Sequence, residues 1–194
     1  MSLARFSLVV AASSALLSCS DPPKPTVSGG AVFQLQSPVG GTPTERCNDI
    51  GLLFKVAVES TDKDKDGNPV YKLILDNADG ASVGCQITSS SFDLKVASTT
   101  RGSLEMTGKY DSTTKKGTTT ALTIITPGGN AYRTVTDGKH PPCDVNVTDT
   151  AEGRFKATFT CPYVFDRKTP DNACSVNSSG AGTTFVQFAN CDVL

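Results

Sequence analysis

The sequence predicts an all-β fold, an antiparallel β-sandwich or barrel of about ten strands held by disulfide bonds. Apolar and polar residues alternate along most segments from about residue 50 onward, which is the period of a strand with one buried face and one solvated face. Gly-containing turn pairs separate these segments at short intervals. Threonine is abundant and glutamate is scarce, and β-branched residues favour strands over helices.

The alternation can be followed through individual segments. Each of the following places its apolar residues on one face: 52–60, 91–98, 103–110, 143–147 and 154–163. In the last of these, the residues predicted to face inward are Phe155, Ala157, Phe159, Cys161 and Tyr163. A turn at 151–153 is expected to join 143–149 and 154–163 into a hairpin. The segment 164–183 is rich in Asn, Ser and Gly, which predicts a loop that Cys174 holds in place.

The first residues have the plan of a secretory signal. Arg5 precedes the largely apolar stretch 6–17, which is too short to span a bilayer because a span needs about 20 residues. The stretch ends in Leu16-Leu17-Ser18-Cys19, which resembles the lipobox of bacterial lipoprotein precursors. The resemblance covers residues 1–20. It implies that residues 1–18 are cleaved and that Cys19 carries acyl chains, palmitate among them, since two or more chains anchor a protein stably. The alternative is an ordinary signal peptide with an incidental cysteine.

The residues after the lipobox fit a lipid-anchored chain. Ser20 in place of Asp after the cysteine implies, by the same resemblance, sorting to the outer membrane, with the domain on its periplasmic or surface side. Residues 19–30 then comprise the lipidated cysteine and a tether. Three prolines favour extended backbone there, and Gly29-Gly30 add a swivel. We expect a poorly ordered tether followed by a single β domain over residues 31–194.

Six cysteines remain once Cys19 is assigned to lipid. They are Cys47, Cys85, Cys143, Cys161, Cys174 and Cys191. None lies in a CxxC pair and the chain has one histidine, so structural disulfides in an exported protein are favoured over a zinc or redox site. The expected hairpin places Cys143 opposite Cys161. We therefore predict the pairs Cys143–Cys161, Cys174–Cys191 and Cys47–Cys85 among the 15 formal connectivities that six cysteines allow.

One stretch resembles a metal site. The first half of an EF-hand calcium loop is matched by Asp62, Asp64, Asp66 and Gly67. The twelfth position should be Glu and is Leu73, and the flanking segments are predicted to be strands. Asn68 and Asp76 are candidates for further oxygen ligands. The competing interpretation is a solvated hairpin tip, so we expect no cofactor and keep calcium as the metal candidate.

Catalytic motifs are weak throughout the chain. His140, the only histidine, lies in a proline-rich stretch without a nucleophile motif, so an exposed loop residue is the expected interpretation. Nothing in the sequence places two carboxylates in a glycosidase arrangement. Tryptophan, which often stacks on sugars, is absent. We expect a protein that is not an enzyme.

The leading hypothesis is therefore a lipid-anchored envelope protein whose non-enzymatic domain binds an envelope partner or ligand, or gives structural support. A net charge of −1 supplies no basic surface for phosphate, which makes nucleic acid a poor partner. Three alternatives stay open. They are a small-ligand carrier with a barrel cavity, a weak calcium-binding module of the adhesion type, and a hydrolase built on clustered carboxylates or a metal.

Overall fold

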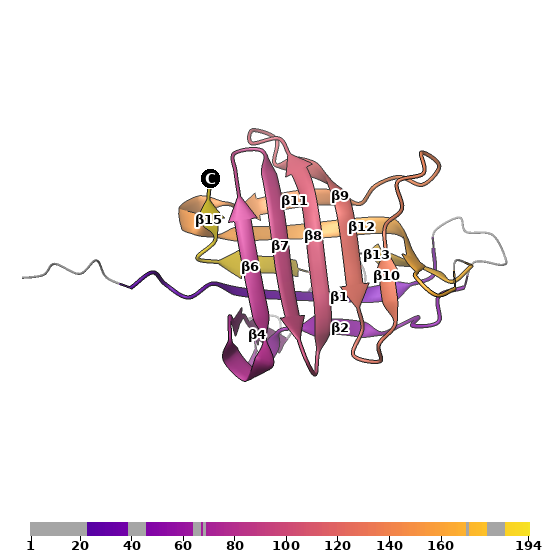
Figure 1. Cartoon of the computed structure of the whole chain (residues 1–194), viewed down its shortest axis with the longest axis horizontal. Helices are drawn as coiled ribbons and strands as arrows, with labels where there is room; N and C mark the ends of the chain where they lie inside the picture. Colours follow the sequence, from indigo (N-terminus) through magenta and orange to yellow (C-terminus); the bar gives the residue numbers. More distant parts are fainter. Residues whose placement is uncertain (1–22, 39–45, 64–66, 68, 170, 178–184) are drawn as a thin grey trace, which may run out of the picture.

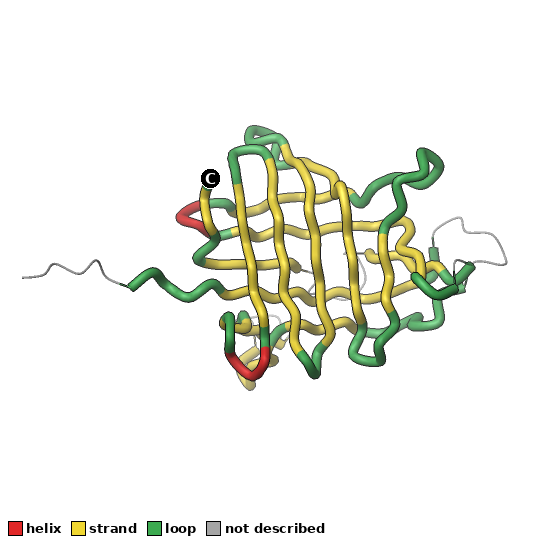
Figure 2. The backbone as a smooth tube through the Cα atoms, viewed as in Figure 1, coloured by secondary structure: helices red, strands yellow, loops and turns green. Residues whose placement is uncertain are grey.

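The fold is all-β, as the alternation predicts (Figure 2). The computed structural model describes residues 23–38, 46–63, 67, 69–169, 171–177 and 185–194. Within these ranges the chain forms fifteen strands and two short 3-10 turns, η1 (Ala78–Gly80) and η2 (Ala151–Gly153). Turns and longer loops separate the strands, and neighbouring strands satisfy one another's backbone hydrogen-bonding groups.

The strands lie in two layers that cross at a steep angle (Figure 1). The front layer consists of β6 (Ser82–Ile87), β7 (Ser91–Ser98), β8 (Gly102–Tyr110), β9 (Lys116–Ile125) and β10 (Ala131–Arg133). The back layer consists of β1 (Ser28–Gln36), β2 (Leu53–Val56), β11 (Asp144–Asp149), β12 (Phe155–Asp166), β13 (Ala173–Asn177) and β14 (Phe185–Ala189). The smaller strands are β3 (Val58–Lys63), β4 (Pro69–Lys72), β5 (Ile74–Leu75) and β15 (Asp192–Val193).

One hydrogen-bonded sheet passes through both layers. β9 pairs with β8 on one side and with β11 and β10 on the other, and both of these strands also pair with β12. Main-chain hydrogen bonds therefore join the layers along this edge. At the opposite edge β15 pairs with β6 in parallel, whereas the sequence predicts antiparallel strands. After β14 the chain crosses from the back layer to β6 without forming a hairpin, so no tight turn makes β15 run antiparallel to β6.

Aromatic rings fill the space between the layers. Phe33 stacks on Phe54 with 4.5 Å between ring centroids and meets Phe159 edge-on at 5.3 Å. Phe92 of the front layer lies 5.0 Å from Phe155 of the back layer. Each of these five side chains is buried, and burial of one such side chain stabilises the fold by about 1.5–3 kcal/mol. The alternation predicts the inward positions of Phe92, Phe155 and Phe159 correctly.

The domain begins three residues earlier than the sequence predicts. Gly29 and Gly30 are expected in the tether, but β1 starts at Ser28 and pairs with β14 and β5. Gly29 lies opposite Phe188, and a Cβ atom at Gly29 would come within 2.4 Å of the Phe188 ring. Gly29 therefore permits close packing between strand and ring. The swivel interpretation of this pair is wrong.

All six cysteines of the domain are joined in three disulfides. The predicted hairpin of β11, η2 and β12 is present, and it carries the predicted bond between Cys143 and Cys161. This bond spans only 18 residues. Strand alternation and one turn are sufficient to predict a contact of that range.

The other two predicted disulfides, Cys47–Cys85 and Cys174–Cys191, are wrong. The structure joins Cys47 to Cys174 across 127 residues and Cys85 to Cys191 across 106. A parallel bridge at residue 46 brings the first cysteine beside β13, and the crossing of the chain from β14 to β6 brings the last one to β6. Both bonds depend on how the layers are connected, which no local pattern encodes.

Candidate functional site

The domain has two distinct ends along β1 and β12 (Figure 1). Gly29, Phe188 and Phe155 are level with one another in the register of β1, β14 and β12, at the end where the N-terminal segment leaves. We call this the tether end, formed by residues 24–27, η2 and residues 190–193. From Phe155, β12 runs about 33 Å to Phe165. We call that opposite end the distal end, formed by the end of β12, β13 and the loops at 46–52 and 134–142.

A β-bulge in β12 turns two aromatic side chains outward at the distal end. Its pairing with β13 shifts register between Cys161 and Val164. Beyond the bulge Val164 is fully buried, whereas Tyr163 and Phe165 are only partly buried. The prediction that Tyr163 faces inward is wrong, because a bulge adds one residue to the alternation. The rings of Tyr163 and Phe165 are nearly parallel, at 9°, with their centroids 5.9 Å apart.

His140 completes this group, and we call His140, Tyr163 and Phe165 the aromatic cluster. The imidazole lies edge-on to both rings, and its centroid is 5.0 Å from that of Tyr163 and 4.8 Å from that of Phe165. Its Nδ1 atom is 2.7 Å from Oδ2 of Asp137. The histidine predicted to be exposed in a loop is in fact partly buried against the sheet.

Asp137 closes the loop that carries His140. Its Oδ1 atom accepts hydrogen bonds from the backbone N–H groups of Lys139 and His140. The backbone N–H of His140, that of Lys139 and the His140 ring together lower the pKa of Asp137 to about 2. A pocket of about 340 Å³ adjoins the loop, lined by His140, Pro142, Val135 and threonines of β9 and residues 134–136.

Buried and partly buried polar groups form hydrogen bonds that stabilise the distal end next to the cluster. The hydroxyl of Tyr132 donates to Oδ2 of Asp49 at 2.8 Å, and Asn130 donates to the same carboxylate. Burial and the Asp49 carboxylate raise the pKa of Tyr132, which keeps its hydroxyl a donor. Asn172 donates to Asp166 at 2.9 Å. These bonds and the neighbouring disulfide hold the distal loops on the sheet, so the aromatic cluster lies on a firm support.

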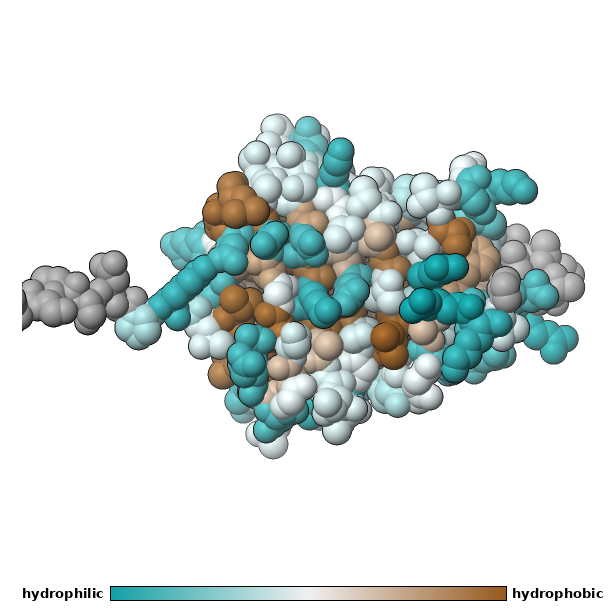
Figure 3. All heavy atoms as spheres, in the orientation of Figure 1, coloured by the Kyte–Doolittle hydropathy of each residue, from teal (hydrophilic) through white to brown (hydrophobic). Residues whose placement is uncertain are grey.

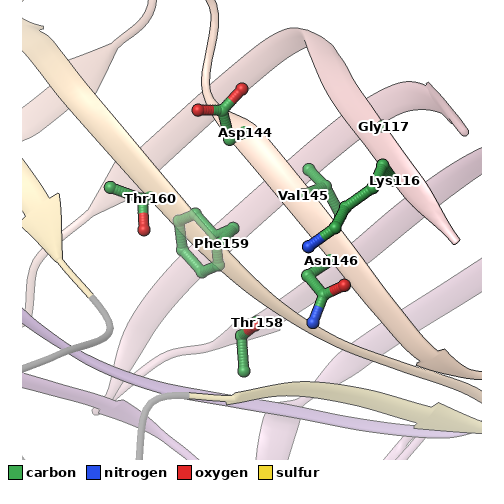
Figure 4. Close-up of a pocket in the computed structure, with 8 residues that line it drawn as sticks. All are labelled: Lys116, Gly117, Asp144, Val145, Asn146, Thr158, Phe159 and Thr160. Carbon is green, nitrogen blue, oxygen red and sulfur yellow. The ribbon is translucent and has the colours of Figure 1, made fainter. Parts of the chain in front are cut away.

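A second hollow, also of about 340 Å³, lies over β9, β11 and β12 (Figure 4). The strand register places Lys116, Asn146 and Thr158 in one row and Asp144 and Thr160 in the next. One basic and one acidic side chain among short polar groups is the composition of an ordinary solvated sheet face. The aromatic cluster is the stronger candidate, because outward aromatic rings are characteristic of binding surfaces.

Exposed apolar side chains do not form a second candidate. The face in Figure 3 is largely hydrophilic, and its apolar residues lie in separate spots. Among the described residues outside the tether end, large exposed ones include Ile50 and Leu75, with exposed fractions of 63% and 52%. Single apolar residues of this kind are normal on protein surfaces and need no ligand to explain them.

The predicted calcium motif is only partly covered by the structure. Asp62 belongs to β3, and β3 and β4 flank the motif as strands, although the strand predicted over 52–60 is divided between β2 and β3. The other ligand candidates of the loop, Asp64, Asp66 and Asn68, lie outside the described residues. Asp76 accepts hydrogen bonds at both carboxylate oxygens. In the part of the chain that the structure describes, no three His, Cys, Asp or Glu side chains are grouped to hold a metal ion.

Cys19 also lies outside the described residues, so its lipid modification stays a prediction. Within the described ranges, no helix has the length and apolar character needed to cross a membrane. Comparison of the chain with protein-family models, with curated proteins and with solved structures gives no match.

Proposed function

We propose that the chain is a lipid-anchored protein of a bacterial envelope whose β domain binds a partner and carries out no catalysis. The lipobox-like Leu16-Leu17-Ser18-Cys19 supports the anchor. The three disulfides support an oxidising compartment outside the cytoplasm. Binding is assigned to the distal end of the domain.

The observation that carries the binding role is the outward pair Tyr163 and Phe165 at the distal end. Aromatic side chains provide large contact area at a small cost in conformational entropy, which is why they are enriched at binding surfaces. The cluster is supported by hydrogen bonds and a disulfide, so little ordering is needed when a partner binds. It lies at the end away from the tether, where a partner can approach.

The contacts of His140 favour binding over hydrolysis. Its pairing with Asp137 at 2.7 Å has the geometry of a base with an orienting carboxylate. Its other ring contacts are the two aromatic side chains, and Asp137 is also used to close the loop. The local structure therefore accounts for His140, which packs on the aromatic rings, and for Asp137, which closes the loop. Likewise, the aromatic packing between the layers favours surface binding over a carrier cavity.

The anchor can be tested with the Cys19→Ala precursor. Without the thiol no thioether to lipid can form, so the variant should lose labelling by radioactive palmitate and should leave the membrane fraction. A Ser20→Ala precursor is the matched control and should keep both properties. A Cys19→Ala protein that still sediments with membranes and is labelled would refute the anchor assignment.

The binding surface can be tested by photo-crosslinking in the native envelope. A photoreactive amino acid at Lys139, beside the cluster, should yield a discrete adduct, whereas the same group at Lys95, on the outer face of β7, should not. Adding Tyr163→Ala to the position-139 variant should weaken the adduct by roughly tenfold, the effect of losing about 1.4 kcal/mol at a binding contact. Equal adducts from both positions, unaffected by Tyr163→Ala, would argue against the distal end as the binding surface.

A further inference from the structure

The N-terminal segment is docked on the domain before β1 begins. Lys24 forms an ion pair with Asp192. Two residues later, the side chain of Asn190 donates to the carbonyl oxygen of Thr26 at 2.8 Å. An exposed ion pair contributes little alone, but these contacts follow one another directly into β1. The described contacts between the tether and the domain therefore begin at Lys24, six residues before Gly30.

This docking shortens the reach of a lipid anchor at Cys19. An extended chain spans at most about 3.6 Å per residue. The five residue steps from Cys19 to Lys24 reach roughly 18 Å, whereas the eleven steps to Gly30 would reach roughly 40 Å. A small folded domain measures about 30 Å across. The docked segment thus leaves too little length for another folded domain to lie between the tether end and the bilayer.

The surface around the docked segment suits a lipid headgroup layer. A hollow of about 460 Å³ is bordered by Lys24, Pro25, Glu152, Asn190 and Val193 among others. It contains basic and acidic groups side by side. Val193 has an exposed fraction of 66%. Zwitterionic headgroups accept charges of both signs, and an apolar side chain gains free energy at the boundary of the acyl chains.

We propose that the tether end of the domain lies against the lipid headgroups, with Val193 among the residues nearest the bilayer. The aromatic cluster is then held at the opposite end, facing away from the membrane. This inference depends on the lipid anchor proposed at Cys19. The docked Lys24–Thr26 segment sets the orientation, and the bilayer surface is the partner of this end.

The orientation can be measured by energy transfer, because the chain has no tryptophan and a single introduced one is a unique donor. The lipidated full-length Val193→Trp and Lys139→Trp variants are each reconstituted in phosphatidylcholine vesicles that contain a dansyl-labelled headgroup lipid. Transfer from position 193 should exceed transfer from position 139 at least roughly threefold, because the two positions are separated by about the length of β12, roughly 33 Å.

A second set of variants tests the docking itself. Adding Lys24→Glu and Asn190→Gly to Val193→Trp removes both contacts that dock the Lys24–Thr26 segment. Glycine is chosen at position 190 because it accommodates the positive φ of 58° found at Asn190. Energy transfer from position 193 to the headgroup lipid should then fall. The charge swap Lys24→Glu with Asp192→Lys restores the ion pair and should keep transfer high. If the Val193→Trp protein does not float with vesicles, the anchor is wrong. If it floats and transfer is equal from both positions, the anchor stands and the orientation is wrong.

Discussion

Replacing Gly29 by alanine should destabilise the domain. The added Cβ would lie 2.4 and 2.6 Å from two ring carbons of Phe188 and 3.0 Å from Cγ1 of Val83. Phe188 is fully buried, so its ring can move only by displacing other core side chains. Overpacking of this kind costs about 1–3 kcal/mol. For a domain of this size we therefore expect the midpoint of thermal unfolding to fall by roughly 2–12 °C.

The neighbouring glycine provides a matched control. A Cβ at Gly30 would lie 3.2 Å from the carbonyl oxygen of Val56 and 3.3 Å from the nearest side-chain atom, so Gly30→Ala should cost less than Gly29→Ala. Combining Gly29→Ala with Phe188→Leu, which removes the obstructing ring, should cost less than the sum of the two single substitutions. All variants are compared by circular dichroism during heating and in urea, in a Cys19→Ala background that is free of lipid.

The result also decides between the two roles of Gly29. Alanine in a flexible tether would leave stability unchanged or raise it by about 0.4–1 kcal/mol, because it restricts the unfolded chain. A midpoint that does not fall in Gly29→Ala, together with strict additivity of the double variant with Phe188→Leu, would refute the close-packing explanation.

Two further predictions concern the disulfides and low pH. Replacing both members of Cys85–Cys191 by alanine should lower the free energy of unfolding more than replacing both members of Cys143–Cys161. The two bonds span 106 and 18 residues, for which loop entropy contributes about 4.7 and about 3 kcal/mol respectively. Urea unfolding measures both losses, and the reverse order would contradict this explanation. Because the pKa of Asp137 is lowered to about 2, the Asp137 carboxylate should stabilise the 134–142 loop fully above about pH 4, and this stabilisation should be lost as the pH falls through 2. Amide hydrogen exchange of the loop should show this loss. The Asp137→Asn variant should show no such dependence on pH.

Local patterns in the sequence predict local parts of the fold. Phe155, Ala157 and Phe159 face inward as alternation predicts, because a strand with one solvated face must repeat every two residues. The turn at 151–153 then places Cys143 opposite Cys161. Each of these depends only on residues within one hairpin, so no knowledge of the layers is needed.

The candidate site could not be predicted in the same way. The two aromatic residues after Pro162 in "CPYVFD" lie outward only because the bulge shifts the alternation. A bulge is selected by pairing with β13, which is distant in sequence from the turn that sets the hairpin. The association of His140 with Tyr163 and Phe165 likewise needs the 134–142 loop to fold back over β12. The Asp-x-x-His spacing of the loop is the one local signal that indicates its closure.

The pairing of β1 with β14 has a consequence for the order in which the domain folds. Ser28 is in register with Ala189, so β1 can pair with β14 only after nearly the whole chain has become available. Contacts at such sequence separation slow folding, because the chain entropy of closing the loop is lost before the contact stabilises the fold. If the chain is exported from its N-terminus, as we propose, the pairing of β1 with β14 would complete the central sheet late in translocation, outside the cytoplasm, where the disulfides can also form.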